Sequence, residues 1–540
     1  PGRLTKRDAR MGLLFISPWI LGALVFLLYP LISSFWYALN NIRMTPLGTN
    51  YTFVGQGNFT QILLSDAEFP TQLINYVVST VISVPIIVVF ALLISIMLNQ
   101  PIKGKGFFRL IFFLPVIIVS GPILGMLNAE GAGSITALDT QAITDAISGF
   151  LPAALAKPIS SIFENMITIL WYSGVQILIF LSALQKIDPS QYEAAKIDGG
   201  SGWECFWKIT LPTIKPMILL NCVYTIVFIS NNDQNEIIEL IKNAMFSGTR
   251  EKGYGYASAM AWVYSIVVLL IVGIFALLFI TKKDVYEKQV KKAKKQMKKD
   301  ERELKRVRRR SARNAAKQEK KQNKARVKEY AKIRAKSGKK FSKEKVRKFF
   351  MGSKEKQGFL KVFCIYALLI CIGFIYLNPI LQMLSKSFMN LDDLLDSSIN
   401  WIPSKFILSN YAQAAKSMDF WASLGKSIIL AGVPTLCNLI SCAIIGYGLA
   451  RFEFPFKKVV LAVIVFTFIL PSQVTMIPTY ALYSQIGILG TILPFVVPPL
   501  LGMGINAPIF ILIFWQFFRQ VPKVLIEAAQ IDGAGYFKSF

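Results

Sequence analysis

Long apolar runs alternate with short polar stretches along most of this 540-residue chain. A membrane-spanning helix needs about 20 predominantly apolar residues, because the bilayer core offers no water to the backbone. We predict ten such spans. They cover residues 13–39, 76–98, 107–127, 162–184, 209–230, 256–280, 363–383, 424–449, 459–479 and 493–518. The pattern therefore predicts an all-α polytopic membrane protein.

Composition narrows the chemistry that such a protein could carry. The chain is 54% hydrophobic and 17% charged, and it contains no histidine. The usual zinc ligand and general base are therefore absent from the sequence. Its 6 cysteines lie in or beside apolar runs without metal-binding spacing. We expect no enzymatic activity and no catalytic, metal or cofactor site in this chain.

One basic segment divides the apolar regions. Residues 282–357 hold 33 Lys or Arg against 9 Asp or Glu, most of the net charge of +29. The positive-inside rule places this segment and the basic N-terminus in the cytoplasm, which requires an even number of spans between them. We interpret the segment as a partly helical cytoplasmic linker that attracts anionic lipid headgroups. Nucleic-acid binding is the alternative, disfavoured because aromatic residues are few there.

A short motif occurs twice, at an offset of 334 residues. Glu-Ala-Ala-x-Ile-Asp-Gly follows the fourth predicted span and again the tenth. In the first copy the loop, about residues 187–212, continues into Ile-x-Leu-Pro. The residues shared by both copies are Glu193, Ala194, Ala195, Asp198 and Gly199, then Glu527, Ala528, Ala529, Asp532 and Gly533.

The first copy predicts two helices joined at an elbow on the membrane surface. Asp188 can cap the first helix, and Gly199 and Gly200 are suited to end it in a left-handed conformation. Ser201 and Glu204 have the spacing of a capping box for the next helix. The alanines allow another protein to approach closely. An ordinary interfacial amphipathic helix is the alternative, which a second copy on the same side of the membrane disfavours.

These residues resemble the EAA loops of bacterial ABC importer permeases, more narrowly the carbohydrate, maltose-type, binding-protein-dependent group. The resemblance implies the type I importer transmembrane fold with two parallel six-helix halves fused in one chain. The first half is then residues 1–281, residues 282–357 form the linker, and residues 358–540 form a second half that is incomplete. We expect about 90 to 110 further residues, with two more spans, beyond residue 540.

The resemblance also implies partners and a location. Each EAA loop becomes a coupling helix that contacts a separate cytoplasmic ABC ATPase dimer, which binds ATP and Mg because this chain has no phosphate-binding loop. An extracellular solute-binding protein delivers the substrate. The chain is expected in the bacterial cytoplasmic membrane as a multi-pass protein with a cytoplasmic N-terminus.

Carbohydrate is the implied substrate. Aromatic, amide and hydroxyl groups that could contact a sugar flank the first loop, at Trp171, Tyr172, Tyr224, Thr225, Asn231 and Asn232. Their alternative role is packing or anchoring at the membrane interface. Other functions left open are an ABC permease for a peptide or amino acid, a secondary transporter, and a membrane scaffold.

Overall fold

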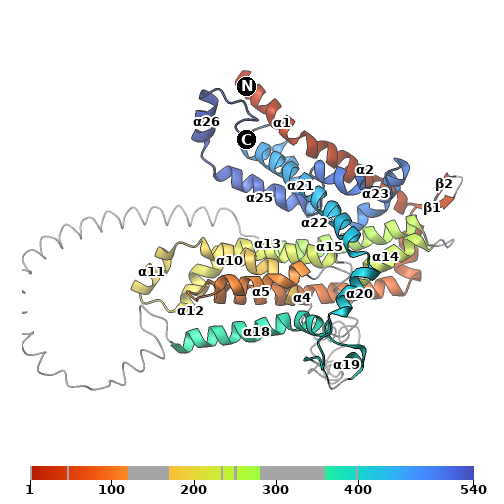
Figure 1. Ribbon diagram of the computed structural model, residues 1–540. Coiled ribbons are helices and arrows are strands. Elements are labelled where there is room, and N and C mark those ends of the chain that lie inside the picture. Colours follow the sequence, from red (N-terminus) through yellow and green to blue (C-terminus); the bar gives the residue numbers. More distant parts are fainter. Residues whose placement is uncertain are drawn as a thin grey trace, which may run out of the picture.

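The computed structural model describes residues 3–45, 48–118, 170–232, 235–247, 252–279, 359–396, 399 and 401–540. The basic linker predicted at 282–357 lies outside these residues, as do parts of the spans predicted at 107–127 and 162–184. The described chain is almost entirely helical, with its long helices running roughly along one direction (Figure 1).

The first part of the chain consists of α1 (Arg3–Ala23), the π-helical turn η1 (Leu24–Leu28), α2 (Tyr29–Ala38), β1 (Asn40–Thr45), β2 (Gly48–Phe53), α3 (Gly57–Thr60), the π-helical η2 (Gln61–Ser65), α4 (Glu68–Asn99) and α5 (Lys105–Ile118). After residue 170 follow α10 (Gly174–Gln185), α11 (Pro189–Ile197), α12 (Gly202–Cys205), the π-helical η3 (Phe206–Thr210), α13 (Leu211–Ser230), α14 (Glu236–Phe246) and α15 (Tyr254–Phe279). The strands β1 and β2 pair as an antiparallel hairpin, which the sequence pattern did not predict.

The second part consists of α18 (Phe359–Lys386), α19 (Leu391–Leu395), α20 (Ser409–Ser417), α21 (Phe420–Arg451), α22 (Lys457–Ile469), α23 (Gln473–Gln485), α24 (Leu493–Leu500), α25 (Ala507–Gln520) and α26 (Lys523–Ile531). Among the described residues, 6 helices are long and apolar enough to cross a membrane, or up to 8 if each bent pair is one span. The straight spans agree with the predicted runs at 13–39, 76–98, 209–230, 256–280, 363–383 and 424–449.

Two predicted spans are broken, and the prediction of continuous helices there was wrong. The run at 459–479 forms α22 and α23, which meet at a bend of 96° around Pro471. The run at 493–518 is divided between α24 and α25 by a turn in which Asn506 has a φ of 56°. Pro498 and Pro499 lie at the end of α24, and proline removes the N–H that would continue the helix. A count of apolar residues does not detect such breaks.

The first helix of each part packs against the other part. Phe15, Ile16 and Trp19 of α1 lie in one buried cluster with residues of α21 and α25. Reciprocally, Leu369 and Tyr376 of α18 lie in the large cluster formed by α4, α5, α10, α13 and α15.

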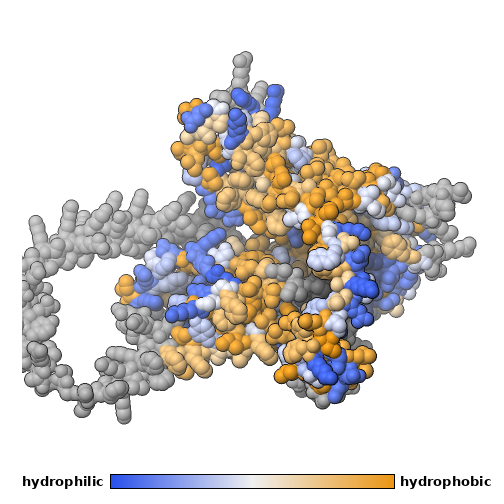
Figure 2. All heavy atoms as spheres, in the orientation of Figure 1, coloured by the Kyte–Doolittle hydropathy of each residue, from blue (hydrophilic) through white to orange (hydrophobic). Residues whose placement is uncertain are grey.

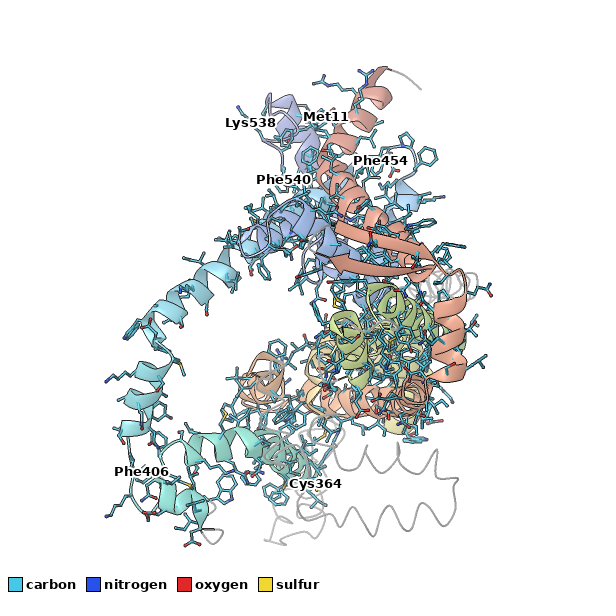
Figure 3. The ribbon with its side chains drawn as sticks, turned by 90° about the vertical axis from the view of Figure 1, so that its right-hand side faces the viewer. Met11, Cys364, Phe406, Phe454, Lys538 and Phe540 are labelled. Atoms are coloured by element: carbon cyan, nitrogen blue, oxygen red, sulfur yellow. The ribbon has the colours of Figure 1, made fainter. Side chains whose placement is uncertain are left out.

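Hydrophobic side chains cover the helical body on the face that Figure 2 shows. Figure 3 shows Met11 of α1 with Phe454, Lys538 and Phe540 at one end of the molecule. Residues near both ends of the chain therefore meet at the same end of the helical body.

Candidate functional site: paired surface helices and a polar path

The first motif copy forms a short, capped helix at one end of the helical body (Figure 1). Asp188 Oδ1 accepts the backbone N–H of Ser190 at 2.9 Å, and this hydrogen bond lowers the pKa of Asp188 below its usual value. At the other end the N–H of Gly200 donates to the carbonyl of Ala195 at 2.8 Å. Gly199 has a φ of 82° and ends the helix in the left-handed region.

The elbow after α11 is held by three polar contacts. Ser201 and Glu204 form the predicted capping box: the N–H of Glu204 donates to Ser201 Oγ at 3.2 Å, and the N–H of Ser201 donates to Glu204 Oε2 at 2.9 Å. Tyr192 and Thr210 then join α11 to the base of α13 through their hydroxyls, 2.8 Å apart. The angle between α11 and the span is therefore fixed by side chains of both helices.

The second copy, α26, ends in the same way and lies at the same end of the molecule (Figure 1). The N–H of Ala534 donates to the carbonyl of Ala529 at 2.9 Å, and Gly533 has a φ of 85°. Arg451 at the end of α21 donates to the carbonyl of Val521 at 3.0 Å and so holds the turn that precedes α26. Both copies are thus short surface helices attached to the end of a longer one.

The two helices expose the same motif positions. Ala195 and Ala529 are half-buried. The other predicted coupling residues are exposed, namely Glu193, Ala194, Asp198 and Gly199 on α11 and Glu527, Ala528, Asp532 and Gly533 on α26.

Ile197 and Ile531, which occupy one motif position, are each 86% exposed. Both copies thus expose an apolar side chain at the same place in the motif. These isoleucines were missing from the residues selected from the sequence. Their recurrence at the same position of both motif copies was the available signal.

The six residues proposed for a substrate path are only partly brought together. Trp171 is buried, and its Nε1 donates to the carbonyl of Tyr376 in α18 at 3.0 Å. Thr225 is fully buried, and its hydroxyl accepts Gln176 Nε2 at 2.8 Å. In this conformation both side chains are therefore engaged in contacts between helices.

Of the remaining four, Tyr172 lies just before α10, Tyr224 lies in the second half of α13, and Asn231 and Asn232 follow α13. Tyr172 and Tyr224 both contact the ring of Phe228, with centroids 5.1 and 6.2 Å away. Asn232 Nδ2 donates to the hydroxyl of Tyr172. Asn231 Oδ1 accepts the backbone N–H of Ser472 at 3.1 Å and its hydroxyl at 2.9 Å.

The contact between Asn231 and Ser472 joins the two parts of the chain. Ser472 lies in the break between α22 and α23, and Asn231 lies at the end of α13. A polar contact at two helix ends is easier to open than a packed apolar one, because the exposed groups can exchange partners with water or a ligand. The sequence prediction identified Asn231 but not its partner.

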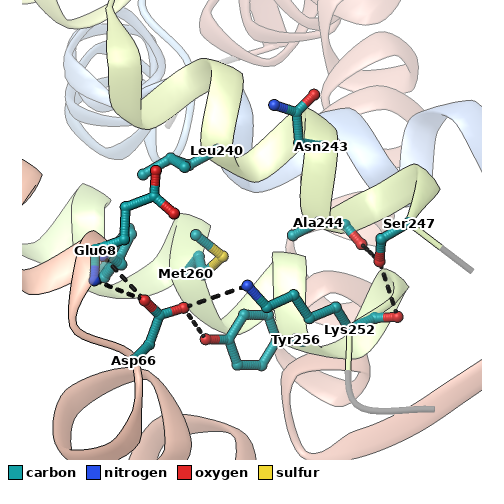
Figure 4. Close-up of a pocket in the computed structure, with 10 residues that line it drawn as sticks. Asp66, Glu68, Leu240, Asn243, Ala244, Ser247, Lys252, Tyr256 and Met260 are labelled. Carbon is teal, nitrogen blue, oxygen red and sulfur yellow. Dashed lines mark hydrogen bonds and ion pairs between the residues drawn. The ribbon is translucent and has the colours of Figure 1, made fainter. Parts of the chain in front are cut away.

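A cavity of about 260 Å³ lies at the opposite end from α11, between the start of α4, α14 and the start of α15 (Figure 4). Asp66 Oδ2 accepts the hydroxyl of Tyr256 at 2.7 Å and lies 3.7 Å from Lys252 Nζ. Asp66 Oδ1 accepts the backbone N–H groups of Glu68 and Phe69 at 2.9 and 3.2 Å. Burial raises the pKa of Asp66, but the hydrogen bond from Tyr256, those from the backbone and Lys252 outweigh it, so the net pKa is lowered.

Asp66→Asn is expected to lower stability by about 1–2 kcal/mol at neutral pH, because charge-assisted hydrogen bonds are lost. The pKa of Asp66 is lowered by folding, so its stabilisation is present above the unfolded pKa of about 4 and is lost as pH falls through the folded pKa. Thermal unfolding of the purified full chain between neutral and acidic pH tests this. Glu68→Gln, at the cavity mouth, is the control. An equal difference between wild type and Asp66→Asn at all pH values would contradict the prediction.

Within the described residues, no group of three or more Cys, Asp or Glu side chains is arranged to hold a metal ion. The features to be explained are therefore the paired surface helices, the polar contact between the two parts, and the apolar helical body. Together they define a polytopic membrane protein with two matching helices exposed at one end.

Comparisons with known proteins agree with that class. Residues 67–292 match the family described as the inner membrane component of binding-protein-dependent transport systems. A lactose transport system permease protein, LacF of Rhizobium radiobacter, is 36% identical over 218 residues, which are 39% of this chain and 70% of LacF. The multiple sugar-binding transport system permease protein MsmF of Streptococcus mutans is 30% identical over 292 residues, 50% of this chain and 94% of MsmF.

A further relative is the trehalose/maltose transport system permease protein MalF of Thermococcus litoralis, 31% identical over 224 residues, 40% of this chain and 72% of MalF. A chain in the crystal structure of a bacterial alginate ABC transporter, in complex with an alginate pentasaccharide-bound periplasmic protein, superposes with a TM-score of 0.38 and 20% identity, covering 51% of this chain and 97% of that one.

The chain belongs to the family of binding-protein-dependent transport system inner membrane components, the permeases of ABC transporters. It has the all-α type I importer fold of that family and is a multi-pass protein of the cytoplasmic membrane. The division of the chain into two fused halves stays a prediction.

Proposed function

We propose that this chain imports a sugar or oligosaccharide that an extracellular solute-binding protein delivers, and that a separate ATPase dimer drives the transport. The observation that carries the proposal is the pair of exposed helices, α11 and α26, with the same ending, the same exposed motif residues and the same location at one end of the molecule. ATP and Mg would be bound by the ATPase and not by this chain.

The two coupling helices would transmit a rigid-body motion. The hydroxyl contact between Tyr192 and Thr210 joins α11 to α13, and Arg451 holds the turn before α26. A displacement of either surface helix therefore moves the span to which it is attached. ATP-driven closure of the ATPase dimer would draw α11 and α26 together and rock the two parts of the permease between inward-open and outward-open forms.

The proposed orientation places α11, α26 and the N-terminus in the cytoplasm. Arg451, Lys457 and Arg519 lie at the ends of helices on the same side as α26, as the positive-inside rule requires. The solute-binding protein would then dock on the face that carries α14, α19 and the hairpin.

The sugar substrate is supported by the relatives and by the residues at the end of α13. The relatives are named for lactose, trehalose/maltose and multiple sugars. Tyr172 and Tyr224 offer aromatic faces, and Asn232 offers an amide, which are groups suited to a sugar ring and its hydroxyls. The contact of Asn231 with Ser472 would close the path while the transporter faces inward.

Asn232→Ala is expected to lower uptake roughly threefold to tenfold, the effect of one lost hydrogen bond. Thermal stability should stay near wild type, because Asn232 is only half-buried. Uptake of labelled oligosaccharides into proteoliposomes measures the effect. Asn99→Ala, at the exposed last position of α4, is the control. Unchanged uptake in both Asn232→Ala and Trp171→Ala would place the substrate path elsewhere.

The proposed function is tested by isolating the complex from native membranes through a tag on this chain. An ATPase with a phosphate-binding loop should copurify, and a panel of sugars should stimulate ATP hydrolysis only with the binding protein present. Stimulation by peptides or amino acids instead would make the chain a permease for another solute. Recovery of no ATPase, with uptake driven by an ion gradient, would identify a secondary transporter.

A further inference from the structure

A second cavity, of about 530 Å³, lies where α21 ends, at the same end of the molecule as α26. The turn between α21 and α22 forms one side, and the last turns of α25 form the other. The lining residues are Leu449, Ala450, Glu453, Phe454, Phe456, Lys457, Lys458, Leu461, Trp515 and Arg519. The cavity thus combines three cationic side chains and one carboxylate with an apolar wall.

The cationic side chains of the cavity have unequal surroundings. Lys457 Nζ donates to the carbonyl of Phe452 at 2.8 Å and to Glu453 Oε1 at 2.9 Å, so the Glu453 carboxylate offsets the charge of Lys457. The Arg519 guanidinium lies over the ring of Trp515, 5.0 Å from its centroid. Lys458 and Arg519 are both exposed. The cavity therefore has an excess of positive charge at its open side, where an anion can approach.

The apolar wall continues outward from the cavity through Phe456. This side chain is 79% exposed, and its backbone has a φ of 61°. A bulky residue in the left-handed region is strained, and such strain persists only where the surroundings impose it. Leu449 and Phe454 form the buried floor, and Leu461 lies beside them. An occupant that satisfies this site has an anionic group and a hydrocarbon chain.

We propose that the cavity binds one anionic glycerophospholipid. Its phosphate group contacts Lys458 and Arg519, and its acyl chains pass over Leu461 and Phe456. A soluble phosphate would leave the exposed Phe456 in water, whereas a membrane lipid covers it. Basic pockets between membrane helices on the cytoplasmic side favour such headgroups. The proposal rests on the orientation given under the proposed function.

The location gives this lipid a role in coupling. Arg519 lies in the last turn of α25, two residues before Val521, whose carbonyl accepts Arg451. A headgroup bound between Arg519 and Lys458 joins the end of α25 to the start of α22. The bound lipid therefore stabilises the end of α25, to which α26 is attached. The lipid acts on the second coupling helix and not directly on the first.

The test uses the complete transporter, with ATPase and binding protein, in nanodiscs of phosphatidylcholine with or without phosphatidylglycerol. The variant is Lys458→Gln combined with Arg519→Gln. The complex is washed in about 1 M NaCl, where the Debye length is about 3 Å, so that lipid attracted only diffusely by the basic linker is released. Native mass spectrometry then counts the phosphatidylglycerol molecules that remain bound in a site. The double variant should retain at least roughly tenfold less, because two basic contacts are lost.

Lys103→Gln is the matched control. Lys103 is exposed in the turn between α4 and α5, the turn of the first part that corresponds to the one between α21 and α22. This variant should retain phosphatidylglycerol as wild type does. Phosphatidylglycerol should also stimulate ATP hydrolysis in wild type and in Lys103→Gln but not in the double variant.

Two results would overturn the proposal. One is equal lipid retention by the double variant and wild type. The other is equal stimulation when glycerol phosphate is added to nanodiscs of phosphatidylcholine, which would identify a soluble anion as the ligand. A thermal unfolding midpoint near that of wild type shows that the double variant is folded. Failure of the proposed function can be distinguished from failure of the lipid proposal, because no ATPase would then copurify with either the wild type or the double variant.

Discussion

Replacing Ile197 and Ile531 together by aspartate is expected to lower ATP-driven uptake at least roughly tenfold while the permease remains folded. Each isoleucine is 86% exposed at the same position of α11 and α26. A central apolar contact in a protein interface contributes about 1–2 kcal/mol or more, and a buried unpaired carboxylate adds a further cost. The loss should appear both as reduced copurification of the ATPase and as reduced ATP hydrolysis in proteoliposomes.

Two control variants separate this effect from a general effect of surface charge. Ile197→Leu keeps an apolar side chain and should retain most of the activity. Ile402→Asp changes an isoleucine that is 78% exposed between α19 and α20, and it should leave ATPase binding unchanged. Wild-type coupling in the double aspartate variant would exclude these isoleucines from the interface.

Gly255→Ala is expected to prevent normal folding of the permease. A Cβ atom at Gly255 would lie 1.8 Å from the carbonyl oxygen of Asn40 and 3.0 Å from that of Tyr37. Both obstacles are backbone atoms, which no change of rotamer can move. The cost should exceed the roughly 1–3 kcal/mol of ordinary overpacking.

Gly273→Ala in the same helix provides a close comparison. Among the described residues, no atom beyond the adjoining backbone of α15 lies within 4 Å of a Cβ built there, and alanine favours helix over glycine. This variant should express and unfold as wild type or slightly better. The measurements are membrane expression and the thermal unfolding midpoint of the purified protein. Similar values for the two variants would contradict the close approach of α15 to the start of β1.

Apolar length was sufficient to predict the straight spans. The helices α4, α18 and α21 each contain a predicted run, and α15 covers all but the last residue of another, because about 20 apolar residues form a helix in a bilayer almost irrespective of their neighbours. The ends of α4, α18 and α21 extend further than predicted, since polar residues such as Glu68 and Arg451 can still continue a helix outside the hydrocarbon region.

The local structure of the first motif was also predictable. Capping by Asp188, the capping box at Ser201 and the left-handed Gly199 all depend on residues within a few positions of one another. Gly200 differs: it has no positive φ, and a Cβ there would lie 2.9 Å from the carbonyl oxygen of Ala195. Its small size is therefore needed for close packing and not for backbone freedom.

Contacts between distant segments could not be predicted from one sequence. Asn231 and Ser472 are 241 positions apart, and nothing in the residues around Pro471 indicates which distant segment they meet. The burial of Trp171 depends in the same way on Tyr376, 205 positions later. Residue type alone therefore could not separate the side chains near the polar contact from those in helix packing.

The exchange of first helices has a consequence for biosynthesis. Phe15 and Ile16 of α1 pack against Gly448 of α21, and the hydroxyl of Tyr536 donates to Asp8, 528 positions away. These contacts of α1 therefore cannot form until α21, and for Asp8 the segment at Tyr536, has been translated. Such distant contacts form slowly. We expect nascent chains that end before α21 to keep α1 accessible to crosslinking lipids and to membrane quality-control proteases, and longer chains to protect it.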